Sequence, residues 1–220
     1  MKNTDSNKSD PSLLHPNFES LVQRIITSVG KDRLAALRKD FHTRLRITLT
    51  QPENSELVED LWDFFYDWCV FEQKLVETDS VFGPEEKNLW SQVKEGCEHG
   101  LYAVQRINPS EIKLKELFNG KVVVVSTRPG SDFLGIVKGD ILEGRLLGKP
   151  GEGPFGFVRR PSYHPTEVHD YIRKKVKEFR KAKDFSTYQS WLWLLVGMYL
   201  KHRIYVHMPI EKIYDDNSRI

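Results

Sequence analysis

The stretch GLYAVQRINPSEIKLKELFNGKVVVV, residues 100–125, decides the fold class, because its apolar side chains recur at about every second position. A period of two is typical of half-buried β-strands, in which successive side chains point to opposite faces. Asn119-Gly120 stands directly before the valine run, and this dipeptide is a strong signal for a tight turn. The stretch therefore predicts short strands joined by turns.

More short strands are expected further along the chain. Residues 141–147 and 155–159 continue the pattern, and glycine-containing turns at Pro129-Gly130, Gly139-Asp140 and 148–153 separate the segments. The region then holds about five or six short strands. No helix of crossover length lies between them, and parallel strands would need one. The pattern favours a small antiparallel β barrel or curled sheet.

Helical periodicity flanks this β region on both sides. The strongest predicted helix runs from Ser55 to Leu75, where apolar side chains form one broad stripe. We expect other helices at 16–30, 34–47, 84–100, 168–179 and 188–199. The predicted fold is α+β, with helical segments packed around the small barrel or curled sheet. Its predicted parts are a disordered tail (1–15), an N-terminal helical region (16–99), a small β module (100–163) and a C-terminal helical region packed on the rest (164–220).

The overall charge gives no general attraction to nucleic acid or to anionic membranes. The chain has 33 Lys and Arg against 31 Asp and Glu, a net charge of +2, so any electrostatic function must depend on a local cluster. Its longest apolar run, Trp191–Leu200, covers only about half of the residues that a membrane-spanning helix needs. The two cysteines cannot build a disulfide framework, and the first residues lack the features of a signal peptide. We therefore expect a soluble, cytoplasmic protein without membrane insertion.

Four short motifs follow one another in an order that is similar to the order found in a known group of proteins. They are Tyr66-Asp67-Trp68-Cys69-Val70-Phe71, Gly100-Leu101-Tyr102-Ala103-Val104, residues 114–120, and Lys138-Gly139-Asp140-Ile141-Leu142 with Arg145-Leu146. Over residues 55–147 the chain resembles a group of uncharacterised bacterial proteins in which an aromatic helix precedes a small β module. The resemblance implies this fold arrangement and no activity. Some members carry a C-terminal SEC-C zinc motif, but this chain lacks the cysteine and histidine cluster for four tetrahedral ligands, so we expect no metal site and no cofactor.

Positive charge gathers locally in the basic region 159–183. Its candidate nucleic-acid-binding residues are Arg159, Arg160, Arg173, Lys174, Lys177, Arg180 and Lys181. Beside a small barrel that offers Phe155, Phe157 and Tyr163 as stacking surfaces, such a set can follow a nucleic-acid backbone. The same charges are also typical of the solvent face of an amphipathic helix, and the acidic helix at 55–75 offers them an internal partner.

The helix expected at 188–199 is apolar on nearly every side and must be covered all round. Trp191, Trp193, Leu194 and Tyr199 are the candidate contact residues of a homodimer or of a groove for another protein. The alternative is that this helix lies at the centre of the fold, where the rest of the chain covers it.

No set of side chains with converging chemistry is evident in the sequence. Asp60, Asp63 and Asp67 share one helix face, but no Glu-x-x-His motif accompanies them, so a solvated or internally paired face is the simpler interpretation. Cys97 and His99 are near neighbours along the chain, and such neighbours rarely point at each other as a nucleophile and its base must. We interpret them as packing plus a cation at a helix end.

These observations favour a non-enzymatic cytoplasmic binding or scaffolding protein that acts through contacts with an unknown protein or with a second copy of the chain. The first alternative is a nucleic-acid-binding module that uses the basic region 159–183. The second is an enzyme whose site lies between the helices and the β module, covered by the glycine-rich segment 148–156.

Overall fold

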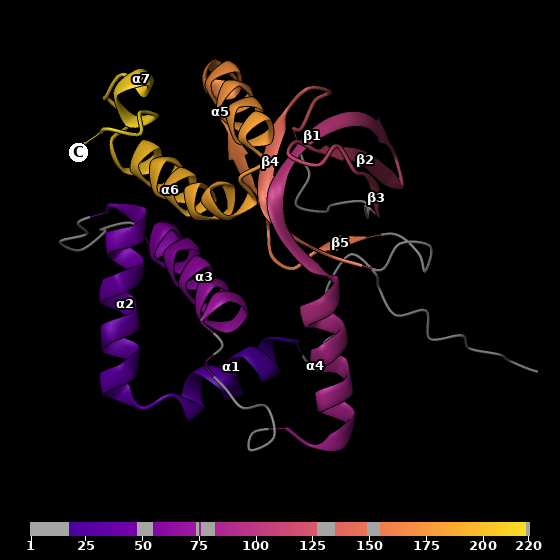
Figure 1. Cartoon of the computed structure of the whole chain (residues 1–220), viewed down its shortest axis with the longest axis vertical. Coiled ribbons are helices and arrows are strands. Elements are labelled where there is room, and N and C mark those ends of the chain that lie inside the picture. The colour runs from indigo at the N-terminus through magenta and orange to yellow at the C-terminus, as the bar shows by residue number, and fades with distance from the viewer. Residues whose placement is uncertain are drawn as a thin grey trace, which may run out of the picture.

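The computed structural model of the chain describes residues 18–47, 55–73, 75, 82–126, 135–148 and 155–218, so the predicted tail (1–15) lies outside the described residues. The fold is α+β, as predicted (Figure 1). The helices are α1 (Phe18–Ser28), α2 (Lys31–Leu45), α3 (Ser55–Glu72), α4 (Pro84–Gly96), α5 (His169–Ala182), α6 (Phe185–Ile204) and α7 (Ile210–Ile213), with a 3-10 turn, η2, at Thr166–Val168. The strands are β1 (Cys97–Asn108), β2 (Glu111–Glu116), β3 (Val122–Ser126), β4 (Ile141–Leu147), β5 (Gly156–Phe157) and β6 (Ser162–His164).

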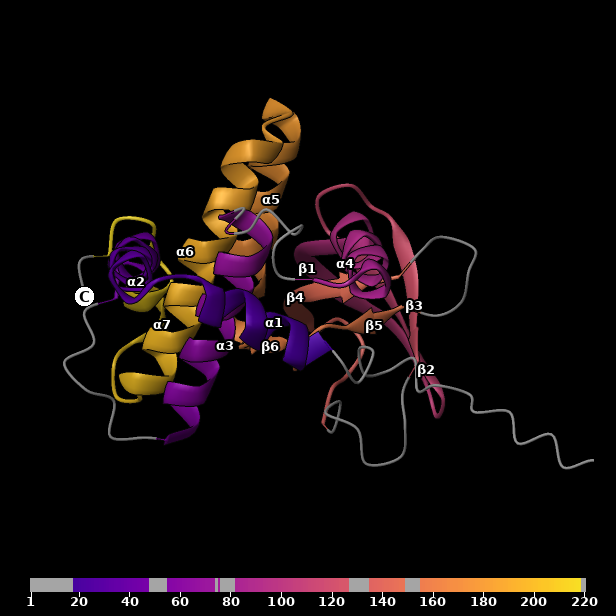
Figure 2. The same cartoon turned by 90° about the horizontal axis from the view of Figure 1, so that it is seen from below.

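The strands form one antiparallel sheet in the order β3-β2-β1-β4-β5, and β6 pairs with β4. At the predicted turn between β2 and β3, Gly120 has a φ of +76°, in the left-handed region that glycine tolerates best. An isolated parallel bridge joins Val125 in β3 to Phe155, immediately before β5. The two ends of the sheet therefore approach each other, and the sheet curls into a half-barrel, seen beside the helices in Figure 2.

The two faces of this sheet have different surroundings. The inside of the half-barrel is filled by Tyr102, Val104, Ile112, Leu114, Val123, Val125, Leu142, Leu146, Phe155 and Phe157. The other face carries His99 opposite Arg145, and Leu101 opposite Glu143, across the β1–β4 pair. Helices α5 and α6 pack against this outer face through an apolar cluster that includes Leu101. The polar side chains of the outer face are therefore buried as well.

Helix α6 is the central helix of the fold. It contacts α2, α3, α5, α7, β1 and β6, and it lies between the α2–α3 pair and the sheet (Figure 1). Asp184 begins the helix as an N-cap, because its Oδ1 accepts a hydrogen bond from the Thr187 backbone N–H at 2.9 Å. The structure thus places the strongly apolar helix at the centre of the molecule.

Two strand boundaries differ from those expected. β1 begins at Cys97 rather than at residue 100, because its pairing with β4 continues to Cys97 opposite Leu147. The strand expected at 155–159 is limited to Gly156–Phe157, since the chain turns away before Arg159. Among the described residues, no helix is both long and apolar enough to cross a membrane.

Gly197 should be essential to the crossing of α2 and α6. A Cβ atom at this position would collide with the backbone carbonyl of Leu45. Gly197→Ala should therefore lower the free energy of unfolding by about 1–3 kcal/mol, as overpacking does, even though alanine favours a helix by about 1 kcal/mol over glycine. The measurement is the urea midpoint of unfolding. Ser190→Ala on the exposed side of α6 is the control, expected within about 0.5 kcal/mol of the wild type. A midpoint that rises for Gly197→Ala would contradict this close packing.

Candidate functional site

The acidic face of α3 does not pair with the basic helix α5. Asp60 forms an ion pair with Arg203 on α6. Asp63 and Asp67 both accept hydrogen bonds from Arg159, at 2.7 and 2.8 Å. Burial raises the pKa of the Asp67 carboxyl, and the Arg159 guanidinium opposes that shift. The internal partners of the acidic helix are therefore arginines outside α5.

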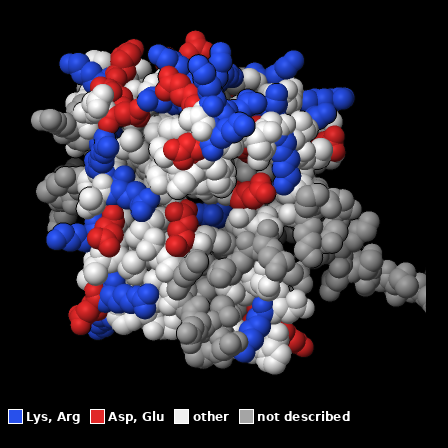
Figure 3. All heavy atoms as spheres, viewed as in Figure 1, with Lys and Arg blue, Asp and Glu red and all other residues white. Residues whose placement is uncertain are grey.

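Helix α5 keeps its positive charges on the surface. Lys174, Lys177, Arg180 and Lys181 are all exposed, and within the described part of the chain none of them forms an ion pair. Lys175, by contrast, pairs with Glu178 and Asp216. Figure 3 shows Lys and Arg side chains gathered along the edge of the molecule where Figure 1 places α5. This edge carries charge that the protein itself does not compensate.

A surface groove runs beside these charges. It has a volume of about 550 Å³ and is lined by Leu117, Arg173, Val176, Lys177, Arg180 and Lys181, and we call it the basic groove. Four cations line it: Arg173, Lys177, Arg180 and Lys181. They are separated by four, three and one residues in chain order, so they share one face of α5. Clefts lined by charges of one sign concentrate ligands of the opposite sign. The basic groove is the candidate site for an anionic polymer.

The fold separates the predicted basic residues into two groups. Arg159 and Arg160 line a different cavity, next to α3. Arg159 forms ion pairs with the α3 carboxylates of Asp63 and Asp67. The other members of the predicted set all lie on α5. The sequence analysis grouped Arg159 and Arg160 with the α5 charges because they are close in the chain. The structure places the two groups at different cavities.

The aromatic side chains expected beside the basic region are not open to a ligand. Phe155 and Phe157 are only 9% and 5% exposed, because they fill the half-barrel, and Tyr163 is half-buried. Their rings are therefore engaged in the core of the β module.

Sequence reasoning missed a different aromatic residue. Phe185, at the start of α6, is 54% exposed, and its ring centroid lies 5.3 Å from that of Phe118. Phe118 directly follows Leu117, which lines the basic groove. The available signal was the position of Phe185 in the first turn of α6, directly after the N-cap Asp184, where a helix end leaves a side chain less covered.

The candidate interface residues of α6 are largely covered by the same chain. Trp191 is 5% and Trp193 is 1% exposed, while Leu194 and Tyr199 are half-buried. The indole N–H of Trp193 donates to both carboxylate oxygens of Glu72 at 2.8 Å. The two tryptophans thus belong to the core of the molecule.

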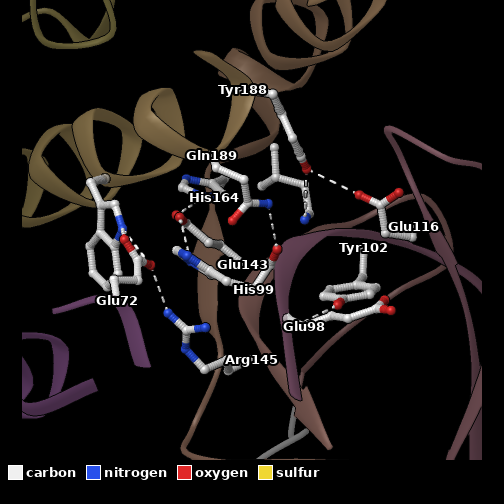
Figure 4. A network of polar contacts seen from close by, with 12 residues as sticks. Glu72, Glu98, His99, Tyr102, Glu116, Glu143, Arg145, His164, Tyr188 and Gln189 are labelled. Atoms are coloured by element: carbon white, nitrogen blue, oxygen red, sulfur yellow. Dashed lines mark hydrogen bonds and ion pairs between the residues drawn. The ribbon is translucent and has the colours of Figure 1, made fainter. Parts of the chain in front are cut away.

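A network of polar side chains is buried where the sheet meets α6 (Figure 4). The Glu143 carboxylate lies between two imidazoles, 3.0 Å from His164 Nε2 and 3.3 Å from His99 Nε2. His164 Nδ1 is 3.1 Å from the hydroxyl oxygen of Tyr214. These four residues come from β4, β6, β1 and the segment after α7, so no spacing in the sequence could reveal them.

Burial controls the protonation of this network. It lowers the pKa of His164 to about 3, and it also lowers the pKa of His99 against the opposing hydrogen bond to Glu143. Both imidazoles are therefore neutral at neutral pH. Burial raises the pKa of Glu143, and its contact with the His99 imidazole opposes that shift. With the carboxylate as acceptor, we assign His164 as donor from Nε2 to Glu143 and Tyr214 as donor to His164 Nδ1, while His99 Nε2 only faces Glu143 Oε1 at 3.3 Å.

Further polar contacts extend the network on both sides (Figure 4). Arg145 donates from Nη2 to Glu72 Oε1 at 2.9 Å, beside the bond from Trp193. Towards the half-barrel, the Tyr188 hydroxyl donates to Glu116 Oε1 at 3.1 Å. Buried polar groups are stabilised by such hydrogen bonds, so the network belongs to the framework of the fold.

Cys97 and His99 open strand β1 instead of ending a helix. His99 is buried and neutral, so its interpretation as a cation at a helix end is wrong. Burial raises the pKa of the Cys97 thiol to about 12, and a thiol that stays protonated is a poor nucleophile.

Two other expectations concern metals and a lid. The described residues contain no group of three His, Cys, Asp or Glu side chains arranged to hold a metal ion. Of the glycine-rich segment 148–156, residues 149–154 lie outside the described ranges.

Comparisons with known proteins add no assignment to this geometry: no family model, no curated protein and no solved structure matches the chain. The resemblance to bacterial proteins with an aromatic helix and a β module therefore stays a prediction.

The buried imidazole of His164 should make the fold sensitive to acid. The unfolded chain takes up a proton at this residue below about pH 6.5, whereas the folded chain does so only below about pH 3. Falling pH therefore favours the unfolded state across this window, by at most about 1.4 kcal/mol per pH unit for one proton. His164→Gln should be less stable than the wild type at pH 7 but lose less stability between pH 6.5 and pH 4.5.

Urea unfolding at a series of pH values measures this difference. Glu143 and His99 are present in both proteins, so both pH profiles contain their titration. His207→Gln removes an exposed histidine and serves as the control. Parallel profiles for the wild type and His164→Gln would show that His164 is not buried as a neutral group.

Proposed function

We propose that this chain is a non-enzymatic binding protein of the cytoplasm whose basic groove binds single-stranded nucleic acid. The observation that carries the proposal is the uncompensated charge of Lys177, Arg180 and Lys181, which line one groove and have no acidic partner among the described residues. The acidic helix α3 could have neutralised them, but Arg159 and Arg203 occupy its carboxylates. Binding of a phosphate backbone releases counterions from that backbone and so stabilises the complex.

The composition of the groove favours phosphate over a protein surface. Lysine is depleted at the centres of protein interfaces, whereas Lys and Arg are the residues that neutralise phosphates. A protein interface would also be expected to present aromatic anchors on α6, but Trp191 and Trp193 are covered by this chain. Contacts through α6 therefore rank below nucleic-acid binding as a function.

The exposed ring of Phe185 supports a single strand as the ligand. Bases of a single strand can leave the stack and lie on aromatic side chains, while bases of a duplex are stacked on each other. Phe185 contacts Phe118 next to the groove, so a strand that follows α5 would bring a base to this ring. Both cysteines are free thiols, which suits a reducing cytoplasm.

Binding should depend on the charges of α5 and on salt. The assay is fluorescence anisotropy with a labelled single-stranded oligonucleotide of about 15 nucleotides. The slope of log Kobs against log salt concentration should be about −3, because each of the four groove cations that neutralises a phosphate contributes about −0.7. The triple variant Lys174→Glu, Lys177→Glu and Arg180→Glu should bind at least about 100-fold more weakly at about 50 mM salt.

A matched variant separates the groove from net charge. Lys31→Glu, Arg33→Glu and Lys39→Glu reverse three exposed charges on α2. Each triple variant changes the net charge by three times −2, from +2 to −4. The α2 variant should keep most of the affinity. Equal losses in both variants, or wild-type binding by the α5 variant, would disprove binding in the groove.

Phe185 should contribute through stacking and not through charge. Phe185→Ala should weaken binding by about 1–3 kcal/mol, which is the contribution of one stacked base, and leave the salt slope unchanged. The same anisotropy titrations measure both quantities. Phe185 is exposed, so circular dichroism should show an intact fold. An unchanged affinity would remove Phe185 from the proposed site.

A further inference from the structure

A small cavity lies between α3, the sheet and α6, and it shares no lining residue with the basic groove. Its volume is about 50 Å³. A water molecule needs roughly 10–15 Å³ on this scale, so the cavity has room for a group of about four non-hydrogen atoms. It lies between the helices and the β module.

His99 forms part of its inner wall and offers an unused hydrogen-bond acceptor. The side chain is 4% exposed, and its ring centroid lies 4.8 Å from that of Trp193. Its Nε2 faces Glu143, while its Nδ1 is buried and has no hydrogen-bond partner within the described structure. Because Nε2 faces the Glu143 carboxylate, we assign the ring proton to Nε2, which leaves the lone pair on Nδ1. A buried acceptor without a donor is costly, so this position favours a ligand that brings an O–H or N–H group.

Two arginines and the α3 carboxylates around the cavity are already paired, while Arg160 is exposed to solvent. Arg145 donates to Glu72, and Arg159 donates to two carboxylates of α3. Asp60, nearer α6, pairs with Arg203. The two arginines and the α3 carboxylates are therefore paired with each other, and an ionic ligand that bound them would have to displace one of these pairs.

The same walls suit hydroxyl groups. A carboxylate has about four lone-pair positions and a guanidinium has five N–H donors, so Asp67 and Arg145 retain capacity beyond their ion pairs. Phe64 and Trp193 add apolar surface to the lining. An uncharged molecule with several hydroxyls can donate to carboxylates, accept from guanidinium groups and place its C–H surface on the rings.

We propose that this cavity binds a small, uncharged polyhydroxylated molecule, a polyol or one end of a sugar, whose hydroxyl donates a hydrogen bond to His99 Nδ1. The proposal does not depend on nucleic-acid binding, because the two sites use different residues.

Nitrogen NMR of the full-length, ¹⁵N-histidine-labelled protein tests this binding directly. Ethylene glycol, glycerol and glucose are the probes, titrated one at a time. An unprotonated ring nitrogen changes its chemical shift when it accepts a hydrogen bond. The Nδ1 signal of His99 should shift and saturate with at least one probe, at concentrations on the order of millimolar for so small a ligand.

His202 provides an internal control in the same spectra. Its Nδ1 is also buried without a partner in the described structure, but it does not line the cavity. His99→Gln and His202→Gln identify the two signals by their loss. Contacts with the Trp193 ring identify His99 independently, even if His99→Gln does not fold.

The three possible results are clearly distinct. A saturating change of the His99 Nδ1 chemical shift, with an unchanged His202 Nδ1 shift, supports binding in the cavity. An equal, linear drift of both signals reports only the changed solvent, and an unmoved His99 signal with all three probes means that the cavity holds water alone. Either of these results overturns the proposal.

Discussion

The arrangement of this protein depends on the need to cover helix α6, which is apolar on almost every side. Helices α2 and α3 cover one side, the sheet and α5 another, and α7 contacts it as well. Gly197 lets the backbone of α2 approach closely. Burial of Trp193 also requires a partner for its indole N–H, and Glu72 supplies that partner. The helix thus determines where buried polar groups must be placed.

Coverage by α6 changes the character of the sheet. The alternation in β4 directs Glu143 and Arg145 away from the half-barrel, to a face that would be polar and wet in an isolated sheet. Here that face is buried, so each polar group needs a neighbour. Glu143 serves two imidazoles, Arg145 pairs with Glu72, and His99 Nδ1 is left with its lone pair beside a cavity.

Local pairing of charges explains why a nearly neutral chain has a basic surface. The net charge is only +2. The carboxylates of α3 are neutralised by Arg159 and Arg203, which are partly buried. Lys177, Arg180 and Lys181 on α5 face solvent along the basic groove without such partners among the described residues. Electrostatic attraction therefore depends on which charges are paired and not on their sum.

The sequence by itself determined the α+β class, the order of the longer helices and of strands β1 to β5, the β2–β3 turn and the basic character of α5, because each follows from periodicity and turn chemistry among near neighbours. The short elements β6 and α7 were not predicted, because three or four residues are too few to show a period. Only the tertiary structure decided which polar groups meet. Asp60 and Arg203, or His99 and Glu143, are far apart in the chain, and their pairing depends on how α3, α6 and the sheet pack. The same packing buries Phe155 and exposes Phe185, since burial is set by contacts between segments and not by residue type.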